Sequence, residues 1–328
     1  MNGIIIIDKP AGWTSHDVIA KLRGALKQKR IGHGGTLDPM ATGVLPVFIG
    51  RATRAAEFCE NAEKEYIAGL RLGIVTDTQD ITGNMISENE VSVTFDDLLS
   101  ILPRFMGAQK QIPPMYSAIK KDGKKLYELA RQGVEVPREA RDIYISTLEL
   151  IETQNLERST TQPSTQSSNH PSAQQLQHII NQHPRTLDSQ HTYPLRIVCS
   201  KGTYIRTLCH DIGSKLGCGG TLSDLRRTRA GVYTIDKSFA LDEVLAAIST
   251  DSVNGLILPI DSIFSNYPSI TLSEDEVFKA KNGAACSTEE KTANGKYKVY
   301  AQDGEFLLLG DVKDGKIKTI KNFFEVPR

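Results

Sequence analysis

Residues 32–39 read Gly32-His33-Gly34-Gly35-Thr36-Leu37-Asp38-Pro39, a glycine-rich turn that ends in a carboxylate directly before a proline. Glycine permits backbone angles that are closed to other residues. Proline fixes its own φ and pushes the residue before it toward an extended conformation. The stretch therefore predicts a rigid loop that presents Asp38. A carboxylate held in this way suits nucleophilic or acid–base chemistry, although an Asp-Pro pair can also begin an ordinary turn.

Further sequence blocks surround this loop. The blocks are Gly3-Ile4-Ile5-Ile6-Ile7-Asp8-Lys9-Pro10, Gly12-Trp13-Thr14-Ser15, Ala41-Thr42-Gly43-Val44-Leu45-Pro46, Gly50-Arg51-Ala52-Thr53-Arg54, Pro113-Pro114-Met115-Tyr116-Ser117-Ala118 and Lys201-Gly202-Thr203-Tyr204-Ile205-Arg206-Thr207. Together with the Asp38 loop they resemble the bacterial tRNA pseudouridine-55 synthase family, known as tRNA pseudouridine synthase B. The resemblance keeps the family's order from about Gly3 to Gly231, with one interruption, and continues weakly to the C-terminus.

The resemblance implies an isomerase that converts uridine 55 in the T arm of tRNA to pseudouridine. This reaction involves no redox change and no energy source, so we expect no cofactor and no metal. The sequence agrees, because it contains neither a Gly-x-x-x-x-Gly-Lys phosphate loop nor a dinucleotide fingerprint. The implied fold is α+β: a large mixed, mainly antiparallel sheet of the pseudouridine-synthase type with a central cleft, followed by a small C-terminal PUA-like β domain.

The family motifs assign the central chemistry to three residues. Asp38 matches the catalytic carboxylate. Arg206 matches a cation that would keep this carboxylate ionised in a dry pocket, where desolvation favours the neutral form; the alternative is a surface ion pair. Tyr66 matches an aromatic ring that stacks on the uracil, and the alternative is a core residue of a strand.

Four other residues complete the substrate-binding set that the resemblance implies. Tyr204 is a second aromatic near the pocket, and Leu225 is a pocket-lining apolar residue that could equally belong to the core. His33 is expected to enter the T loop and to help hold bases out of the stack. Arg54 is expected to contact an RNA phosphate, a role that any exposed lysine or arginine could also fill.

Charge distribution, rather than net charge, points to an RNA partner. The chain has 39 Lys and Arg residues and 39 Asp and Glu residues. Between Arg104 and Arg141, however, nine basic residues face four acidic ones, and between Lys201 and Gly231 six face two. Clustered basic charge is consistent with a phosphate-binding face, although charge runs are often only solvated surface.

The expected domain organisation has two parts. Residues 1–250 form the catalytic domain, with an RNA-gripping thumb at about 104–141 and a low-complexity insert at about 153–192. The insert is rich in Gln, Ser, Thr, Asn and Pro, holds four of the seven histidines and should lack stable order. Residues 251–328 form the PUA-like RNA-binding domain.

Local patterns predict individual elements. The β-branched run Ile4–Ile7 indicates a buried strand. Ser15 is expected to cap a helix. Glu65 to Gly73 alternates, which is typical of a half-buried strand. Apolar residues at helical spacing predict a helix from Ile205 to Leu216, terminated by Gly217.

Cysteine spacing and hydropathy indicate the cellular compartment in which we expect the protein. The five cysteines have no zinc-knuckle or disulfide-framework spacing, which favours a reducing compartment. No signal peptide or membrane span is recognisable, so we expect a cytoplasmic protein that binds no membrane. Three alternatives remain open: a guide-RNA-dependent pseudouridine synthase, a non-catalytic tRNA-binding or folding module, and a zinc-dependent RNA enzyme.

Overall fold

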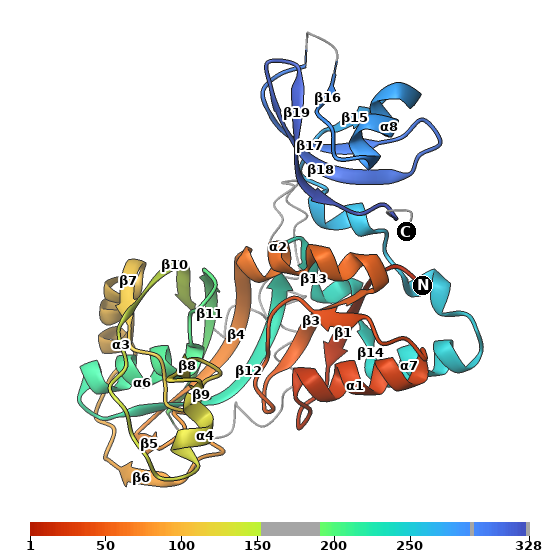
Figure 1. Cartoon of the computed structure of the whole chain (residues 1–328). Coiled ribbons are helices and arrows are strands. Elements are labelled where there is room, and N and C mark those ends of the chain that lie inside the picture. Colours follow the sequence, from red (N-terminus) through yellow and green to blue (C-terminus); the bar gives the residue numbers. More distant parts are fainter. Residues whose placement is uncertain (152–190, 289–291, 326–328) are drawn as a thin grey trace, which may run out of the picture. The chain divides into compact units, whose positions relative to one another are not determined.

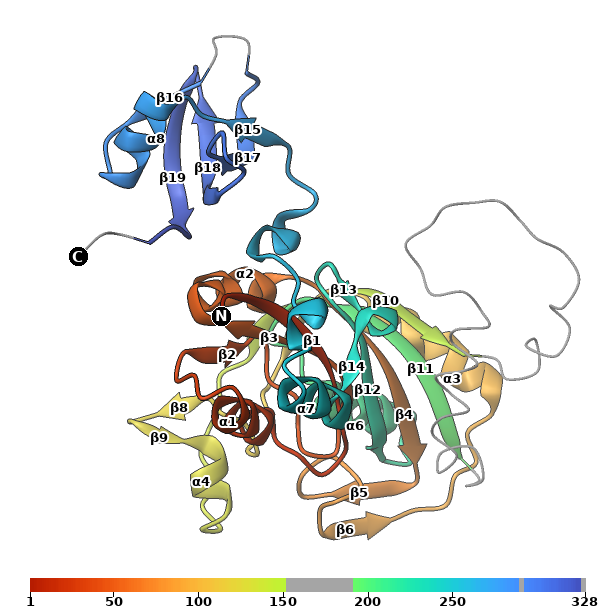
Figure 2. The same ribbon diagram turned by 90° about the vertical axis from the view of Figure 1, so that its right-hand side faces the viewer.

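The computed structural model describes residues 1–151, 191–288 and 292–325 (Figures 1 and 2). Its internal contacts divide the chain into two compact units. Unit 1 comprises Met1–Ala62 and Thr228–Arg328, and unit 2 comprises Glu63–Arg227. None of the described helices is long and apolar enough to cross a membrane.

Unit 1 contains one part of a large sheet, in the order β14-β1-β3, with β2 paired to β3 and β13 paired to the end of β12. The strands are β1 (Gly3–Lys9), β2 (Ile31–His33), β3 (Thr42–Ile49), β13 (Tyr233–Thr234) and β14 (Phe239–Ala240), with the last three residues of β12 (Gly220–Ala230), most of which lies in unit 2. Within it β1 and β3 are antiparallel and β1 and β14 are parallel. The buried strand predicted at Ile4–Ile7 is confirmed, since these four side chains are at most 1% exposed.

Helices α1 (Ser15–Ala25) and α7 (Leu241–Ser249) pack on this sheet and share an apolar core with β1 and β3. The prediction that Ser15 caps α1 is wrong. Thr14 is the cap: its hydroxyl accepts a hydrogen bond from the Asp17 amide, and the Asp17 carboxylate accepts one from the Thr14 amide. This reciprocal pair satisfies two amides that the helix leaves free. Ser15 is the first helical residue, and its hydroxyl is used elsewhere.

Two short helices follow β3 in unit 1, namely η1 (Gly50–Ala55) and α2 (Ala56–Asn61). Further along the chain come η4 (Ile235–Lys237), η5 (Val253–Leu256) and η6 (Ile260–Phe264). Phe264 of η6 is 2% exposed and meets Phe58 edge to face, with ring centroids 5.0 Å apart. Such aromatic pairs add to the area that they bury.

Unit 2 carries the other part of the sheet, in the order β12-β4-β11-β10-β7. Its strands are β4 (Lys64–Leu72), β7 (Gly107–Gln111), β10 (Arg141–Leu150) and β11 (Thr192–Cys199), with two hairpins, β5 (Ile74–Thr76) with β6 (Met85–Glu88) and β8 (Lys120–Lys121) with β9 (Lys124–Lys125). Its helices are α3 (Phe95–Ile101), η2 (Leu102–Phe105), α4 (Leu126–Ala130) and α6 (Ile205–Leu216).

Strand β4 departs from the prediction of a half-buried strand. Eight of its nine residues are buried, so both faces are covered. Even Glu65 is only 1% exposed, and its carboxylate accepts a hydrogen bond from Arg196 at 3.1 Å. A buried carboxylate is tolerated because it is paired.

Helix α6 agrees with the prediction at both ends. It runs from Ile205 to Leu216, and Gly217 closes it in the left-handed conformation at φ +81°. The expected insert at 153–192 lies outside the described residues apart from its last two, and Thr192 already belongs to β11. On either side of it, Leu150 of β10 pairs with Leu195 of β11, and the Ile151 amide donates to the Pro194 carbonyl at 2.9 Å.

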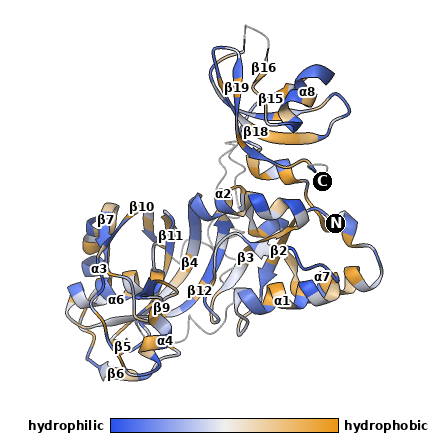
Figure 3. Cartoon of the chain, viewed as in Figure 1, coloured by the Kyte–Doolittle hydropathy of each residue, from blue (hydrophilic) through white to orange (hydrophobic). Residues whose placement is uncertain are grey.

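The C-terminal part of unit 1 is a curled five-stranded sheet in the order β15-β17-β18-β19-β16. Its elements are β15 (Ser269–Thr271), α8 (Glu274–Lys281), β16 (Cys286–Ser287), β17 (Gly295–Tyr300), β18 (Phe306–Lys313) and β19 (Lys316–Asn322). The apolar run of β18, orange in Figure 3, fills the core of this sheet with Val299 and Ile317. The architecture is thus the mixed α+β fold, with a large mainly antiparallel sheet and a small C-terminal β domain, that the sequence predicts.

Candidate active site

Asp38 lies half-buried in the loop between β2 and β3. The loop is closed by backbone hydrogen bonds from the Gly34 amide to the Pro46 carbonyl at 2.9 Å and from the Ala41 amide to the Asp38 carbonyl at 3.1 Å. Gly34 has no room for a side chain, because a Cβ there would lie 2.7 Å from Cys59 and 2.8 Å from Phe48. The predicted rigidity therefore comes from close packing as well as from backbone preference.

Ser15 fastens this loop to the start of α1. The Leu37 amide donates to Ser15 Oγ at 2.8 Å, and the Ser15 hydroxyl donates to the Leu37 carbonyl at 3.3 Å. Ser15 is fully buried and Leu37 is 3% exposed. A buried backbone group left without a partner costs about 1–3 kcal/mol, so this pair of hydrogen bonds fixes the residue that precedes Asp38.

Lys9 fastens the other side of the loop. Its ammonium group is fully buried and donates to three carbonyl oxygens, those of Trp13 at 2.6 Å, Pro10 at 2.9 Å and Pro39 at 3.3 Å. The Gly12 amide donates to the same Pro39 carbonyl at 2.8 Å. Burial of a charge is costly unless it is well partnered, so Lys9 ties the residue after Asp38 to the end of β1.

The two other residues assigned to the site in unit 1 have different surroundings. His33 is the last residue of β2, and its ring meets the edge of His16 at a centroid distance of 5.5 Å. Arg54 lies in η1, where its guanidinium donates to the Asn322 side chain at 2.6 Å and to the Asn322 carbonyl at 3.3 Å. Contact of Arg54 with an RNA phosphate would thus compete with its hydrogen bonds to the end of β19.

Arg206 is a buried cation of unit 2 with several fixed contacts. It lies in the first turn of α6 and is 4% exposed. Its Nη1 donates to the Thr78 carbonyl at 3.0 Å, its Nη2 donates to the Tyr116 carbonyl at 2.9 Å, and its Nε lies 3.8 Å from Asp80 Oδ2. The alternative of a surface ion pair is therefore excluded for this residue.

Asp80 is itself held in place. Its Oδ1 accepts hydrogen bonds from the Thr82 amide at 3.0 Å, the Thr82 hydroxyl at 2.5 Å and the Thr78 hydroxyl at 3.0 Å. Next to it, Gln79 has φ +63°, and its side-chain carbonyl accepts from the Thr207 hydroxyl at 2.7 Å. The connection that follows β5 is thus an ordered cradle for the start of α6.

Gln111 takes the place of a side-chain cap at the start of α6. Tyr204, the residue before the helix, has no capping side chain of its own. The Tyr204 amide donates to Gln111 Oε1 at 2.8 Å, and Gln111 Nε2 donates to the Tyr204 carbonyl at 3.0 Å. Gln111 is the last residue of β7, and Tyr116 follows shortly after it. This one short segment therefore contacts Tyr204 through Gln111 and Arg206 through the Tyr116 carbonyl.

Tyr66 and Leu225 lie on strands of unit 2 and are 9% and 7% exposed. Tyr66 pairs with Ile197 across β4 and β11, and Leu225 lies in β12. Next to Leu225, burial raises the pKa of the Asp224 carboxyl to about 6, although the Ser223 hydroxyl, which donates to Asp224 at 2.9 Å, lowers it.

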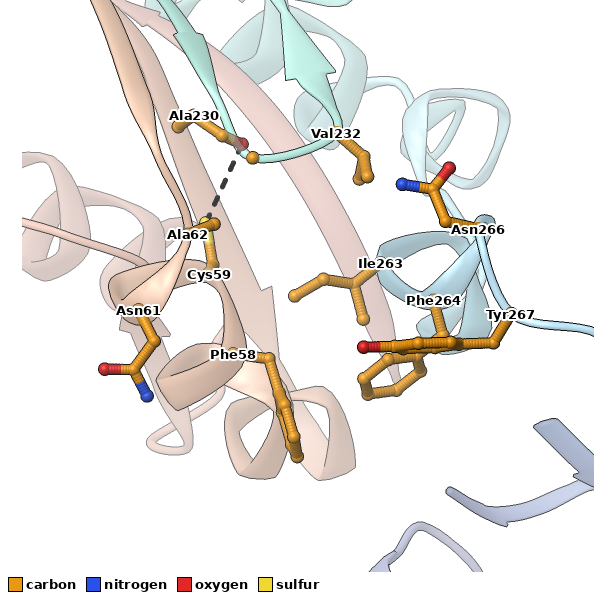
Figure 4. Close-up of a pocket in the computed structure, with 11 residues that line it drawn as sticks. Phe58, Cys59, Asn61, Ala62, Ala230, Val232, Ile263, Phe264, Asn266 and Tyr267 are labelled. Carbon is orange, nitrogen blue, oxygen red and sulfur yellow. Dashed lines mark hydrogen bonds between the residues drawn. The ribbon is translucent and has the colours of Figure 1, made fainter. Parts of the chain in front are cut away.

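A cavity of about 340 Å³ lies elsewhere in unit 1 and is drawn in Figure 4. Phe58 and Tyr267 face each other across it, with Cys59 at one side and Asn266 at its rim. None of the residues assigned to the site from sequence lines it. Among the described residues, no three His, Cys, Asp or Glu side chains gather as a metal-binding group.

Comparison with known proteins decides the family. The model of the TruB family pseudouridylate synthase N-terminal domain matches residues 23–169, and the model of the tRNA pseudouridylate synthase B C-terminal domain matches residues 206–265. The tRNA pseudouridine synthase B of Clostridium kluyveri is 37% identical over 327 residues, covering 98% of this chain and all of that protein. The chain belongs to the TruB family of pseudouridylate synthases. It is therefore an isomerase.

Other relatives agree with this TruB assignment. The tRNA pseudouridine synthase B of Syntrophomonas wolfei is 39% identical over 324 residues, covering 98% of this chain and 96% of that protein. Among solved structures, a Cbf5-Nop10-Gar1 complex contains a chain that matches with a TM-score of 0.67 and 24% identity, covering 99% of this chain and 85% of that one. This likeness confirms the expected fold class.

Sequence reasoning missed the residues that support the candidate site. Lys9 and Ser15 lie within the quoted blocks without an assigned role at the Asp38 loop, and Asp80 has no assigned role. Their signal lies in contacts across the chain: Ser15 and Leu37 are 22 residues apart, and Gln111 and Tyr204 are 93 apart. No local pattern shows such a pairing.

Proposed function

We propose that this chain isomerises uridine 55 in the T arm of tRNA to pseudouridine, with Asp38 as the catalytic carboxylate and the target base flipped out of its stack. The observation that carries the proposal is the fixation of the Asp38 loop from both sides, by Ser15 at Leu37 and by Lys9 at Pro39. A group that reacts with one atom of a base needs such a fixed position. The relatives named tRNA pseudouridine synthase B support tRNA as the substrate.

The reaction rearranges one bond. The N1–C1′ glycosidic bond breaks, the uracil turns, and a C5–C1′ bond forms; C5 then loses its proton and N1 gains one. Asp38 could attack C1′, attack C6 or stabilise a charged intermediate, and each route requires the ionised carboxylate. We assign to Arg206 the role of keeping Asp38 ionised during the reaction.

The remaining residues are assigned to the substrate. Tyr66 stacks on the flipped base and Leu225 lines its pocket, with Tyr204 as a second aromatic at the start of α6. His33 holds the T loop open, and Arg54 binds a phosphate. Extruding a base costs a few kcal/mol, which stacking and polar contacts must recover.

The lysine-rich hairpin β8–β9 supports RNA binding. Its four strand residues are all lysines, namely Lys120, Lys121, Lys124 and Lys125. Structured RNA is recognised largely by shape and phosphate contacts, which suits a basic thumb. From the family resemblance, we also assign residues 251–328 to a second, PUA-like RNA-binding domain.

A direct test uses the purified chain and an unmodified T-arm transcript, with no guide RNA. Wild-type protein should form pseudouridine at the position of uridine 55. Asp38→Asn and Asp38→Ala should bind the transcript with unchanged affinity and lose at least 10³-fold in rate. Asp77→Asn changes a half-buried carboxylate of unit 2 that accepts hydrogen bonds from Asn84, and it is the matched control.

The outcomes separate the rival functions. Pseudouridine formed only after a guide RNA is added would support the guide-dependent enzyme. Binding without any pseudouridine in the wild-type protein would support a tRNA-binding or folding module. Pseudouridine formed by Asp38→Ala would show that another group is the catalytic carboxylate.

A further inference from the structure

The cavity of about 340 Å³ in unit 1 plays no part in the proposed reaction (Figure 4). Its walls are the end of α2, the turn between β12 and β13, and η6 with the residues that follow it. Cys59 lines the cavity and also packs against the Asp38 loop, since a Cβ added to Gly34 would lie 2.7 Å from it. The cavity is therefore a neighbour of the catalytic loop, but none of the residues assigned to catalysis lines it.

Buried contacts hold the walls of this cavity in place. Phe264 is 2% exposed and contacts both aromatic walls, with its ring centroid 5.0 Å from that of Phe58 and 6.4 Å from that of Tyr267. The Tyr267 amide donates to the Phe264 carbonyl at 2.9 Å, and the Cys59 thiol donates weakly to the Ala230 carbonyl at 4.0 Å. The space is thus preformed, as in most small-molecule sites.

The aromatic walls select a flat ring system. The Phe58 ring stands at 82° to Phe264, whereas the Tyr267 ring is inclined at only 32° to it. The Phe58 and Tyr267 rings are therefore steeply inclined to each other, so a ring stacked on Tyr267 presents its edge to Phe58. Both arrangements are favourable for aromatic groups. Since a cavity of about 150 Å³ holds one benzene ring, this cavity has room for about two fused rings.

The chemistry of the lining favours an uncharged ligand. None of the eleven described residues that line the cavity is charged. An ionised group would lose its hydration there without gaining a counterion. A base within an RNA strand brings phosphates on both sides, and proteins that stack such bases combine the stack with a cationic groove. The lining therefore fits a neutral molecule that is not part of a nucleic-acid chain.

Two polar groups at the cavity are available to a ligand. In Figure 4 the Tyr267 ring reaches across the cavity with its hydroxyl ahead, and Asn266 lies at the rim. Within the described ranges, neither the Asn266 side-chain amide nor the Tyr267 hydroxyl has a hydrogen-bond partner. An amide and a phenol each offer both a donor and an acceptor. They match a ring system that carries donors and acceptors along its edge.

We propose that this cavity binds a neutral, flat molecule of two fused heteroaromatic rings, of the chemical class of a free purine base. One face of the ligand stacks on Tyr267, and its edge forms hydrogen bonds with Asn266. The site is distinct from that of the target uridine. Its occupancy is independent of the proposed function, because neither Asp38 nor Arg206 takes part in it.

Two probes test the proposal. Adenine is neutral at pH 7 and carries ring nitrogens and an amino group on two fused rings. Indole has a similar flat area but only one donor at its edge. Isothermal titration of the full chain gives dissociation constants for both probes, and thermal unfolding checks that each variant folds.

Four variants and a control locate the binding. Tyr267→Ala removes the stacking face, Asn266→Ala removes an exposed amide, and Val232→Trp fills the cavity from the turn between β12 and β13. The matched control is Tyr144→Ala, the same change at a tyrosine of β10 that is 52% exposed and does not line the cavity. Asp38→Ala shows whether adenine occupies the catalytic loop instead.

Wild-type protein should bind adenine with a Kd on the order of 0.1–1 mM, as expected for a ligand of about ten non-hydrogen atoms. Tyr267→Ala should weaken binding about tenfold and Asn266→Ala about threefold, whereas Val232→Trp should abolish it. Indole should bind the wild-type protein about threefold more weakly than adenine. Tyr144→Ala and Asp38→Ala should keep the wild-type Kd.

Absence of saturable adenine binding to the wild-type protein up to about 10 mM would overturn the proposal. So would equal affinities of Tyr267→Ala and Tyr144→Ala, or unchanged binding to a folded Val232→Trp. If Tyr267→Ala does not fold, Asn266→Ala and Val232→Trp decide the question.

A competition with saturating unmodified tRNA identifies the source of the ring. Adenine binding that responds to Tyr267→Ala and persists beside tRNA supports a free ligand. Displacement of that adenine by tRNA would show that the cavity takes an RNA base and would overturn the assignment. None of these measurements requires pseudouridine formation, so their failure is distinguishable from failure of the proposed function.

Discussion

Ser15 and Leu37 hold each other through both backbone groups of Leu37: the Leu37 amide donates to Ser15 Oγ at 2.8 Å, and the Ser15 hydroxyl donates back to the Leu37 carbonyl at 3.3 Å. One side chain thus satisfies the peptide group that precedes Asp38, inside a buried environment. Positioning of the proposed catalytic carboxylate depends on this short connection to α1.

Ser15→Ala should lower kcat strongly and the free energy of unfolding only moderately. Loss of the hydroxyl leaves two buried backbone groups without a partner, at a cost of about 1–3 kcal/mol. A loosened Asp38 should lower kcat by roughly 10–100-fold with little change in KM, since misplacement of a reacting group by about 1 Å is enough for such a loss. Single-turnover rates on T-arm RNA and urea unfolding measure the two effects.

The neighbouring Thr14→Ala is the control for this prediction. It removes the cap of the same helix at a cost of about 1 kcal/mol but leaves Leu37 untouched. Equal loss of kcat in both variants would mean that α1 as a whole, rather than Ser15, positions the loop.

Asp80→Asn tests the cradle of Arg206. The guanidinium and the carboxylate are 5% and 8% exposed, and removal of one charge from a buried pair leaves the other without compensation. We expect a loss of about 2–4 kcal/mol in unfolding free energy and a fall in kcat/KM. In Arg206→Lys, kcat/KM should fall further, because one ammonium group cannot reach both the Thr78 and Tyr116 carbonyls as the planar guanidinium does. Asp77→Asn on the same connection should change neither quantity.

Gln111→Leu should loosen the start of α6. It removes both hydrogen bonds to Tyr204. The Tyr204 carbonyl keeps the Leu208 amide as its donor, so the loss of the acceptor for the Tyr204 amide should dominate, at a cost of about 1–3 kcal/mol. If Gln111 positions Arg206 through this helix start, kcat/KM should fall more than in Gln109→Leu, a half-buried neighbour on β7 whose side chain donates to the Arg104 and Met106 carbonyls and not to α6. Gln111→Glu, which keeps an acceptor for the Tyr204 amide but no donor for its carbonyl, should lie between the two. Identical kinetics for the Gln109 and Gln111 variants would contradict the positioning role.

Asp224 gives the fold a pH dependence of known sign. Its folded pKa of about 6 lies above the ordinary value of 3.8 because of burial. Well below pH 4 both states carry the proton. As pH rises from 4 to 6 the unfolded chain ionises first, so stability should fall by up to about 3 kcal/mol and then level off.

Asp224→Asn should remove this decline, because the amide stays neutral and can still accept from Ser223. The variant should be more stable than wild type at pH 7 and equal to it near pH 4, as measured by urea unfolding across that range. A wild-type curve that rises between pH 4 and 6 in parallel with the variant would refute the assignment.

Sequence patterns predict several elements of this fold. Ile4–Ile7 and helix α6 with Gly217 follow from local chemistry, because each depends on residues within a few positions. The Asp38 loop follows from local chemistry only in part, because distant residues such as Lys9 and Ser15 also hold it. Alternation in β4 could not show that its second face is covered, since that depends on elements far along the chain. Thr14 and Ser15 are both good caps, and only the remote Leu37 backbone decides which of them serves α1.

The sequence proposes residues for the candidate site but not the contacts that hold them. Motifs point to Asp38 and Arg206, whereas Lys9 and Asp80, which contact the Asp38 loop and Arg206, are ordinary charged residues by sequence. What distinguishes them is burial with satisfied partners, which arises only when segments distant in sequence pack together.

The pairing of Leu150 with Leu195 has a practical consequence. The chain leaves β10 and returns on β11 at the same sheet position, so the distance between these two points is set by the strands. Closure entropy grows only with the logarithm of the number of intervening residues. A reporter protein or affinity tag whose termini lie close together could therefore be spliced in at this junction, which offers a handle for single-molecule or pull-down work that leaves both chain ends native.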